Sequence, residues 1–436
     1  MNAAVVSIAF LEKEILIKEI FIWEEQYMNT GDTAFILICS AFVFLMTPGL
    51  AFFYGGLVRR KNVCNTMMAC VFIMGLSVVM WILFGYSLAF GTDHGGVIGG
   101  FNWLGLNGIG METGPYADSI PHLVYVAFQM MFAMITPALI TGAVVGRMKF
   151  KAIFLFVFLW QFVVYYPMAH MVWGGGFLAQ IGSIDFAGGN VVHISSGVSG
   201  LVLAILIGKR KGIEKRSVVP HNIPFVVLGA SLLWFGWFGF NAGSALAADG
   251  LALHAFTTTN TSAACAMLSW MIIDIIKGGK PTVVGACTGG VIGLVAITPG
   301  AGFVPIWASF IIGALVSPIC YFALSVLKPK FGYDDALDAF GCHGIGGIWG
   351  GIATGLFAQT SINPVAKWDG LVFGDYHLFV AQVLSILVTI AVAVVGTLIC
   401  VGIVRLFTKL RVDENSENVG LDDSEHGERA YSAIWE

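Results

Sequence analysis

Two histidines lie inside apolar stretches of this chain, and an aspartate precedes each at the same distance. Asp185 stands eight residues before His193, and Asp335 stands eight residues before His343, with small residues between them. Ionisable side chains are expected within a membrane only where they line a cavity or pair with one another. We therefore interpret the two stretches as one motif used twice, and we predict that it brings two imidazoles together.

Two imidazoles in contact suit a small polar molecule. A neutral imidazole donates a hydrogen bond from one ring nitrogen and accepts at the other, so a pair can form without any charge. For an isolated histidine we would favour a bond to a backbone carbonyl instead, but the repeated spacing favours the pair. Cys342 beside His343 gives two potential metal ligands and the sequence places no third. We predict no metal site and no cofactor.

The two aspartates each allow two roles. In a membrane protein, Asp185 and Asp335 are candidates for function by default. Alternatively, an aspartate near a helix N-terminus caps the free N–H groups and complements the helix dipole. The two roles can coexist, and the sequence leaves both open.

Aromatic side chains are spaced so that several share helical faces. Trp237, Phe240 and Ser244 lie at i, i+3 and i+7, and Phe128 and Phe132 lie at i and i+4. Aromatic faces can hold a desolvated cation with about 2 kcal/mol of cation–π attraction, and the Ser244 hydroxyl can accept a hydrogen bond. The alternative is that these stripes simply face lipid or the protein core.

The composition is typical of a helical membrane protein. Of 436 residues, 57% are hydrophobic and 11% are charged, with a mean hydropathy of +0.85, whereas about 25% of a soluble domain is charged. The 55 glycines fit closely packed transmembrane helices. The net charge of −4 is uninformative about nucleic acid, but no basic arm appears, and we predict no nucleic-acid partner. The eight cysteines mostly stand singly in apolar runs, so we expect no disulfide framework.

Apolar segments that are long enough to span a bilayer, about 20 residues each, follow one another from Thr33 onward. The fold class is therefore all-α and polytopic. We expect about eleven transmembrane helices, at roughly 33–57, 66–91, 122–146, 152–182, 190–208, 222–247, 253–276, 282–298, 306–327, 338–358 and 378–407.

Basic residues occur in alternate loops, and the opposite loops after Thr33 hold only one, Lys367. Because positive loops face the cytoplasm, we predict that the N-terminus lies outside and the C-terminus inside. The first five helices end with that of His193, and the next five end with that of His343. Five helices per half require an inverted repeat, whose interface holds the substrate path near the membrane midplane; the eleventh helix lies outside the repeat.

We divide the chain into an N-terminal extension (1–31), a transmembrane domain (32–408) and a cytoplasmic tail (409–436). Residues 1–27 lack the basic start of a secretory signal, we assign them no function, and Met28 is an alternative start. The tail is mostly polar and acidic, and we predict a solvated segment.

Two glycine-containing patterns have simpler interpretations. Gly347, Gly351 and Gly355 recur at every fourth residue, as in tight helix packing. The run Gly197–Gly200 matches the GxSG string of intramembrane serine proteases, with Ser199 as nucleophile. Because short Gly/Ser strings are common in glycine-rich helices, we do not predict an enzyme.

Six runs then form an ordered pattern from about Asp32 to Tyr431, which leaves only the N-terminal extension uncovered. They are Thr47–Asn62, Ala169–Gly176, Asp185–Gly189 with His193, Trp237–Ser244, Phe340–Gly344 and Gly420–Tyr431. Together they resemble the ammonium transporter family (Amt/Mep, distantly the Rhesus proteins). The resemblance implies eleven helices, an inverted five-plus-five repeat and a homotrimer with one pore in each subunit, as a multi-pass protein of the cell membrane.

The resemblance also implies roles for single residues. It maps an outer ammonium-recruitment site onto Phe132, Trp173 and Ser244, and a gate of stacked phenylalanines onto Phe132 and Phe240. It maps the family's two pore histidines onto His193 and His343.

Asp185 matches an aspartate important for transport in that family. The tail resembles a cytoplasmic C-terminus that helps to couple subunits and can meet the P-II nitrogen-regulatory protein.

We therefore predict an ammonium transporter that gathers the ion at the aromatic site, deprotonates it and conducts ammonia past the histidines. An ion would meet a desolvation penalty of several kcal/mol in an apolar lumen. Potassium cannot lose a proton, so this route rejects it. The sequence leaves open whether the proton follows separately, and an ammonium sensor that signals through its cytoplasmic face is the alternative.

Overall fold

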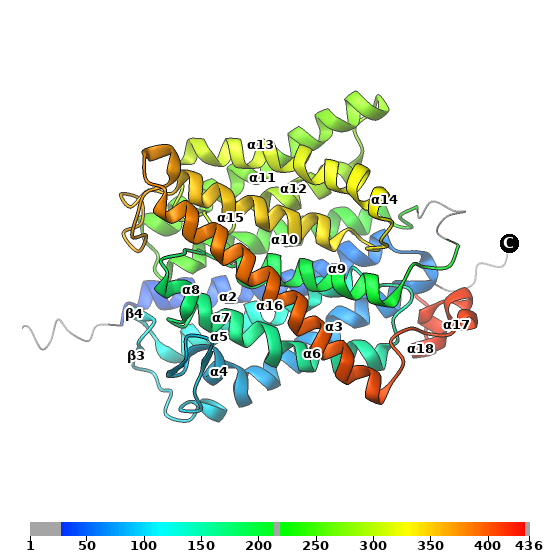
Figure 1. The fold of residues 1–436 in the computed structure, drawn as a ribbon, viewed down its shortest axis with the longest axis horizontal. Coiled ribbons are helices and arrows are strands. Elements are labelled where there is room, and N and C mark those ends of the chain that lie inside the picture. The colour runs from blue at the N-terminus through cyan, green and yellow to red at the C-terminus, as the bar shows by residue number, and fades with distance from the viewer. Residues whose placement is uncertain (1–27, 213–218, 432–436) are drawn as a thin grey trace, which may run out of the picture.

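Long apolar helices form most of the structure, a computed structural model that describes residues 28–212 and 219–431 (Figure 1). Within these residues, nine helical stretches are long and apolar enough to cross a membrane, judged by length and composition. This confirms a polytopic helical membrane protein. The N-terminal extension up to residue 27 lies outside the described residues.

The part of the chain before residue 212 holds helices that often continue through a π-helical turn, η2, η4 or η5. The helices are α2 (Thr30–Leu57), α3 (Val63–Met80) with η2 (Trp81–Gly85) and α4 (Tyr86–Phe90), α5 (His122–Thr141), α6 (Phe150–Trp160) with η4 (Gln161–Tyr165) and α7 (Tyr166–Trp173), α8 (Phe177–Gln180), and η5 (Gly189–Ile194) with α9 (Ser195–Ile207).

The part after residue 219 also contains helices that are continuous with π-helical turns, here η7 and η8. Its helices are α10 (Ile223–Ala242) with the short turn η6 (Gly243–Ala245), α11 (Gly250–Gly278), α12 (Val283–Ile297), α13 (Ile306–Phe322) with η7 (Ala323–Leu327) and α14 (Lys328–Phe331), η8 (Phe340–Ile345) with α15 (Gly346–Phe357), α16 (His377–Phe407), α17 (Glu414–Val419) and α18 (Leu421–His426).

Short elements complete the described residues. Two antiparallel hairpins, β1 (Asp93–His94) with β2 (Ile98–Gly99) and β3 (Thr113–Gly114) with β4 (Ala117–Pro121), lie between α4 and α5. Single 3₁₀ turns occur at η1 (Arg60–Asn62), η3 (Leu104–Leu106) and η9 (Leu371–Phe373).

Each of the eleven predicted segments overlaps at least one of these helices, although α12 and α15 are not among the nine stretches of membrane-spanning length. The largest difference in a helix boundary concerns the segment predicted at 122–146. Helix α5 ends at Thr141, and turns follow as far as Arg147. Gly146 adopts a left-handed φ of 77° in these turns, a conformation that ends a helix. Hydropathy alone does not detect this end, since residues 142–146 of the turns are themselves apolar and buried.

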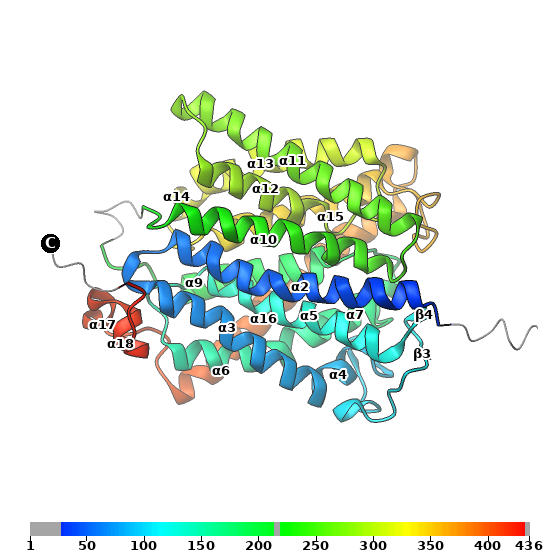
Figure 2. The same cartoon turned by 180° about the vertical axis from the view of Figure 1, so that it is seen from behind.

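Close helix crossings depend on glycine. A Cβ at Gly229 of α10 would lie 2.2 Å from the backbone nitrogen of Phe53 in α2, and these two helices run side by side (Figure 2). The predicted glycine ridge of α15 packs likewise: a Cβ at Gly347 would meet Ile194 and His193 at 3.0 and 3.1 Å. Helix α16 crosses over α6, α9 and α15 (Figure 1).

The C-terminal segment is packed against the bundle, which differs from the predicted solvated tail. Helices α17 and α18 lie at one end, here called the tail end, and the β hairpins lie at the other (Figure 1). Leu421 is fully buried and its N–H donates to Asn62 Oδ1 at 2.9 Å. The Asn65 N–H donates to Asp422 Oδ1 at 2.8 Å. Many tail residues are exposed as predicted, but composition records polarity and not these long-range partners, so the buried residues of the tail were missed.

Candidate functional site

His193 and His343 come together in the interior, as the repeated motif predicts. His193 lies in η5 and His343 in η8, and their ring centroids are 5.3 Å apart with an interplanar angle of 22°. They are 1% and 4% exposed. The rings are therefore stacked within a buried path formed by two segments that are 150 residues apart in sequence.

The two rings do not form the hydrogen-bonded pair that we considered possible. Within residues 28–212 and 219–431, both ring nitrogens of His193 and the Nδ1 of His343 are buried without a hydrogen-bond partner. Buried polar groups without partners are costly, so such groups are rare and point to strain or function. These nitrogens are able to bind a small polar molecule in the path.

The cavity beside the histidines is narrow and mostly apolar. Its volume is about 20 Å³, which is enough for about one water-sized molecule. Trp237 stacks on His193 with centroids 5.4 Å apart. The side chains lining the cavity are those of Met46, Leu50, Phe53, Tyr54, Ile135, Leu139, Val192, His193, Leu233, Trp237, Phe240, Thr288, Val291, Leu337, Ala339, Cys342 and His343.

Asp185 supports the first histidine from the start of η5. Its carboxylate accepts hydrogen bonds from the backbone N–H groups of Gly188, Gly189, Asn190 and Val191, at 2.8, 2.6, 2.7 and 3.4 Å. The chain reverses at Gly188, whose φ of 121° suits glycine. The capping geometry considered from the sequence is thus present, and Asp185 acts on the turn that carries His193 rather than on its ring.

Asp335 holds the equivalent position before η8. It is fully buried and accepts from the N–H groups of Ala339 and Phe340, at 3.1 and 2.7 Å. Burial, together with the neighbouring Asp338 carboxylate, raises the pKa of Asp335 to about 6. Lys328 lies beside both, since its Nζ donates to the Asp335 carbonyl at 2.7 Å and to Asp338 Oδ1.

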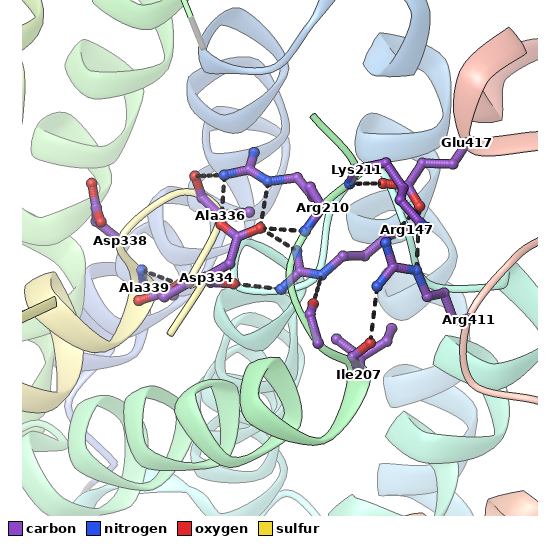
Figure 3. A network of polar contacts seen from close by, with 12 residues as sticks. Arg147, Ile207, Arg210, Lys211, Asp334, Ala336, Asp338, Ala339, Arg411 and Glu417 are labelled. Atoms are coloured by element: carbon purple, nitrogen blue, oxygen red, sulfur yellow. Dashed lines mark hydrogen bonds and ion pairs between the residues drawn. The ribbon is translucent and has the colours of Figure 1, made fainter. Parts of the chain in front are cut away.

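Asp334, adjacent to Asp335, takes part in a different contact. Arg210 binds its carboxylate at two points, 2.9 Å from Nε and 2.7 Å from Nη2. Arg147, fully buried, donates to the Asp334 carbonyl oxygen and lies 3.9 Å from its carboxylate. Figure 3 shows both arginines converging on Asp334. This network fixes the loop before η8 to the loops after α5 and α9.

Helix α16 supplies residues that the sequence reasoning missed. Gln382 forms two hydrogen bonds of 2.9 Å with the backbone of Ile184, beside Asp185. Ser385 accepts from the Asn190 amide at 2.9 Å, and Thr389 donates to the carbonyl oxygen of that amide at 3.3 Å. Polar residues at three- and four-residue intervals in an apolar helix were the available signal, because such residues seek partners within a membrane.

The predicted aromatic residues also come together. Phe132 and Phe240 are 4.3 Å apart between centroids with an angle of 31°, and both are buried. Trp173 stands edge-on to Phe132 at 5.8 Å. Phe240 in turn lies 6.2 Å from His193. The two phenylalanines therefore stand between Trp173 and the histidines.

Phe132, Trp173 and Ser244 line one open cavity of about 300 Å³ on the other side of the phenylalanines. The Ser244 hydroxyl donates to the Phe240 carbonyl at 2.8 Å, so its oxygen remains able to accept. Trp173 donates to the carbonyl of Asp185 at 2.9 Å, which links this cavity to the turn holding His193.

Gln129 is a further polar residue of this cavity that we did not predict. It is 8% exposed, and its Oε1 has no hydrogen-bond partner in the described part of the chain. An amide one turn before Phe132, within an apolar segment, was the signal that could have identified it. Gln129 lines the same cavity as Ser244, although its Oε1 is itself buried.

The protease string has a structural explanation. Ser199 in α9 is fully buried, and its Oγ accepts a hydrogen bond from the Trp160 indole at 2.9 Å. Over residues 28–212 and 219–431, no cluster of three or more His, Cys, Asp or Glu residues suits a metal ion.

An aromatic cavity, two packed phenylalanines and two buried imidazoles in a helical membrane protein define a transport protein for a small polar solute. The chain belongs to the ammonium transporter family: residues 34–431 match the sequence model of the Ammonium Transporter Family. This confirms the resemblance found in the sequence.

Individual relatives agree with this family. The ammonium transporter of Bacillus subtilis (strain 168) is 52% identical over 404 residues, covering 93% of this chain and 99% of that protein. The crystal structure of Saccharomyces cerevisiae Mep2 is similar with a TM-score of 0.83 at 36% identity, covering 89% of each chain. A structure of a sensor Amt protein is similar with a TM-score of 0.82 at 26% identity, covering 91% of this chain and 98% of that one.

Proposed function

We propose that this ammonium transporter gathers the ammonium ion in the outer aromatic cavity, deprotonates it and conducts ammonia past His193 and His343. The observation that carries the proposal is the set of buried ring nitrogens without partners on a narrow apolar cavity. Such nitrogens offer hydrogen bonds to a molecule of the size of ammonia.

The aromatic cavity suits the ion rather than the neutral molecule. Phe132 and Trp173 present aromatic surface, which attracts a cation by about 2 kcal/mol when water is excluded. The Ser244 hydroxyl oxygen adds an acceptor for an N–H donor, and the polar side chain of Gln129 lines the same cavity. Asp185 lines the same cavity, although its carboxylate oxygens are occupied by backbone N–H groups.

Beyond Phe132 and Phe240 the path no longer suits an ion. The cavity beside the histidines is lined mostly by hydrocarbon, and moving an ion there costs several kcal/mol more than moving a neutral amine. Deprotonation before or at the histidines removes this cost for ammonium. Potassium has no proton to lose, so it is rejected by its chemistry rather than by its size.

We further propose the topology on which this path depends. Eleven helices cross the membrane, with an inverted five-plus-five repeat and α16 outside it, the N-terminus outside and the C-terminus inside. The matched positions of η5 and η8, each preceded by a buried aspartate, support two related halves. The division at 1–31, 32–408 and 409–436 belongs to the same proposal.

The assembly is proposed from the family resemblance alone. We infer a homotrimer in the cell membrane, with the tail available to a P-II signalling protein on the cytoplasmic side.

An ammonium sensor is the second candidate. Similarity to a sensor Amt protein over 91% of this chain favours it, as do the contacts of α17 and α18 with the loops at the tail end. In a sensor, ammonium binding would change the tail while little ammonium crossed.

Ammonium-evoked currents and internal pH, measured together in proteoliposomes, separate these functions. A transient current supports transport coupled to charge. An internal pH rise without a current would mean conduction of neutral ammonia alone. Silence in both measurements, with the protein folded and inserted, would contradict transport and favour the sensor.

A further inference from the structure

A group of basic residues at the tail end lies away from the histidine path. Lys149 precedes α6, Arg405 lies in the last turn of α16, and Lys409 follows that helix. These three, with Arg411, line an open cavity of about 700 Å³. Its remaining walls are Leu206, Ile207, Thr408, Leu410, Val412 and Asp413. The cavity therefore has a cationic rim and a partly apolar wall.

The four cations of this cavity differ in the number of hydrogen bonds and ion pairs that their side chains form. Arg411 donates to Glu417 Oε2 at 2.7 Å and to the Ile207 carbonyl at 3.2 Å, as Figure 3 shows. Among the described residues, the side chains of Lys149, Arg405 and Lys409 form no hydrogen bond or ion pair. These three are available for an anion.

One carboxylate faces the cavity as well. Asp413 accepts from the N–H of Ser416 at 2.9 Å and from its hydroxyl at 3.1 Å, and so caps α17. These bonds lower the pKa of Asp413, so it remains charged. Lys149, Arg405 and Lys409 outnumber this one carboxylate. The net charge of the cavity lining is therefore positive.

Exposed apolar side chains stand at the same end of α16 as the cavity. Leu406 and Phe407, between Arg405 and Lys409, are 80% and 66% exposed. They end a 31-residue helix that contains an 18-residue stretch with a mean hydropathy of 2.8. At the end of such a helix, cations beside exposed apolar groups match the boundary between lipid headgroups and acyl chains.

We propose that this cavity binds the headgroup of an anionic phospholipid. The phosphate contacts Lys149, Arg405 and Lys409, and the acyl chains lie along Leu406 and Phe407. A free phosphate would use the same cations but would gain nothing from the apolar flank. The site is independent of the proposed path of ammonium, because none of its residues lines either cavity of that path.

The bound lipid would connect three helices. The Lys149 N–H donates to the Leu410 carbonyl at 2.9 Å, and Arg411 holds the end of α9 through Ile207. Helix α9 continues from the turn that carries His193. A lipid held at Lys149, Arg405 and Lys409 thus joins α6, α16 and the end of α9, and we expect it to raise thermal stability.

The test uses the full chain purified in detergent and titrated with phosphatidylglycerol or phosphatidylcholine while thermal unfolding is followed. We expect phosphatidylglycerol to raise the unfolding midpoint and phosphatidylcholine to leave it unchanged. The variant Lys149→Gln/Arg405→Gln/Lys409→Gln should need about 100-fold more phosphatidylglycerol for the same rise, since each basic residue near a charged lipid surface contributes about fivefold.

A matched control removes the same charge elsewhere. Lys277, Lys280 and Lys330 are exposed, and Lys277→Gln/Lys280→Gln/Lys330→Gln should respond to phosphatidylglycerol like the unaltered protein. An equal loss in both triple variants would overturn the proposal, because it would show attraction to net charge only. If the first triple variant does not fold, Lys409→Gln alone should still weaken the response by about fivefold, and an unchanged response would contradict the site.

A third arm distinguishes the lipid from a free anion. Inorganic phosphate at millimolar concentration should neither raise the midpoint nor reduce the effect of phosphatidylglycerol. If inorganic phosphate stabilises the protein to the same extent, and the triple variant loses that effect, the cavity is an anion site and the lipid assignment is wrong.

Discussion

The two histidine turns have the same local design but different supports. Both η5 and η8 are π-helical, and each follows a buried aspartate placed eight residues before its histidine. Asp185 accepts four backbone N–H groups, whereas Asp335 accepts two. The carboxylate at the first turn therefore meets mainly backbone, and the one at the second turn lies beside other charges.

The neighbours of the two turns continue this contrast. Neutral side chains of α16 bind around the first turn, at Ile184 and Asn190. Arg210 and Lys328 bind the loop that leads into the second. The comparison teaches that the first histidine turn is fixed by hydrogen bonds from backbone N–H groups and neutral side chains, whereas the loop before the second is fixed by ion pairs near the tail end.

Removing the first aspartate should have the largest effect. Asp185→Ala leaves four buried N–H groups without their acceptor, and we expect a loss on the order of 3–5 kcal/mol in unfolding free energy and of most ammonium current. Asp335→Ala should cost about 1–3 kcal/mol, because it frees only two. Thermal unfolding in detergent and proteoliposome currents check this order. Equal losses would mean that the two turns are not held differently.

A substitution where α9 crosses η8 should have the second-largest effect on stability and current. A Cβ at Gly197 of α9 would lie 2.2 Å from the backbone nitrogen of Gly344, next to His343. We expect Gly197→Ala to cost about 1–3 kcal/mol through overpacking and to reduce ammonium current by separating the histidines. Thermal unfolding measures the first and proteoliposome current the second.

Gly402→Ala in α16 is the matched control for that crossing, since nothing lies within 4 Å of the added Cβ. It should be neutral or raise stability by up to about 1 kcal/mol. Should Gly197→Ala prove equally harmless, close approach of the halves would not be what positions His343.

The smallest expected effect is a pH dependence of the unfolding free energy that arises from Asp335 at the second turn. The pKa of Asp335, raised to about 6 by burial and by Asp338, exceeds the value of about 3.9 in an unfolded chain. The folded state thus binds more protons between these values, so wild type gains stability as pH falls from 7 to 5. Asp335→Asn lacks this gain, and we expect a relative difference of about 1 kcal/mol between the two pH values.

Thermal unfolding at pH 5 and pH 7 measures this difference. The exposed Asp118→Asn variant provides the background for removing one carboxylate. A difference between pH values that is the same in wild type and Asp335→Asn would show that Asp335 does not titrate in this range.

Much of the path could be predicted because its residues carry local signals. The apolar segments set the helices, and the repeated Asp–His spacing set the histidine pair. Helical spacing placed Phe240 near Trp237, but the contact of Phe132 with Phe240 joins separate helices, and only the family resemblance suggested it. The predicted pairing of the imidazoles was incomplete, because ring orientation depends on Trp237 and the helix crossing.

The supports of the path could not be predicted to the same extent. Asn190 and Ser385 are 195 residues apart, and no local pattern pairs them. The π-helical turns add a residue to the helix without a sequence signature, so the sequence could offer capping by the two aspartates only as one of two open roles. The packing of Leu421 and Asp422 against the loop at Asn62 likewise depends on tertiary structure alone.

The central claim is that ammonium is selected at the two histidines, and one measurement tests it most directly. Currents evoked by ammonium and by potassium are compared in proteoliposomes that hold either wild type or His193→Ala/His343→Ala. The account predicts a response to ammonium and not to potassium in wild type, and loss of that discrimination in the double variant. A double variant that still selects ammonium over potassium would contradict it.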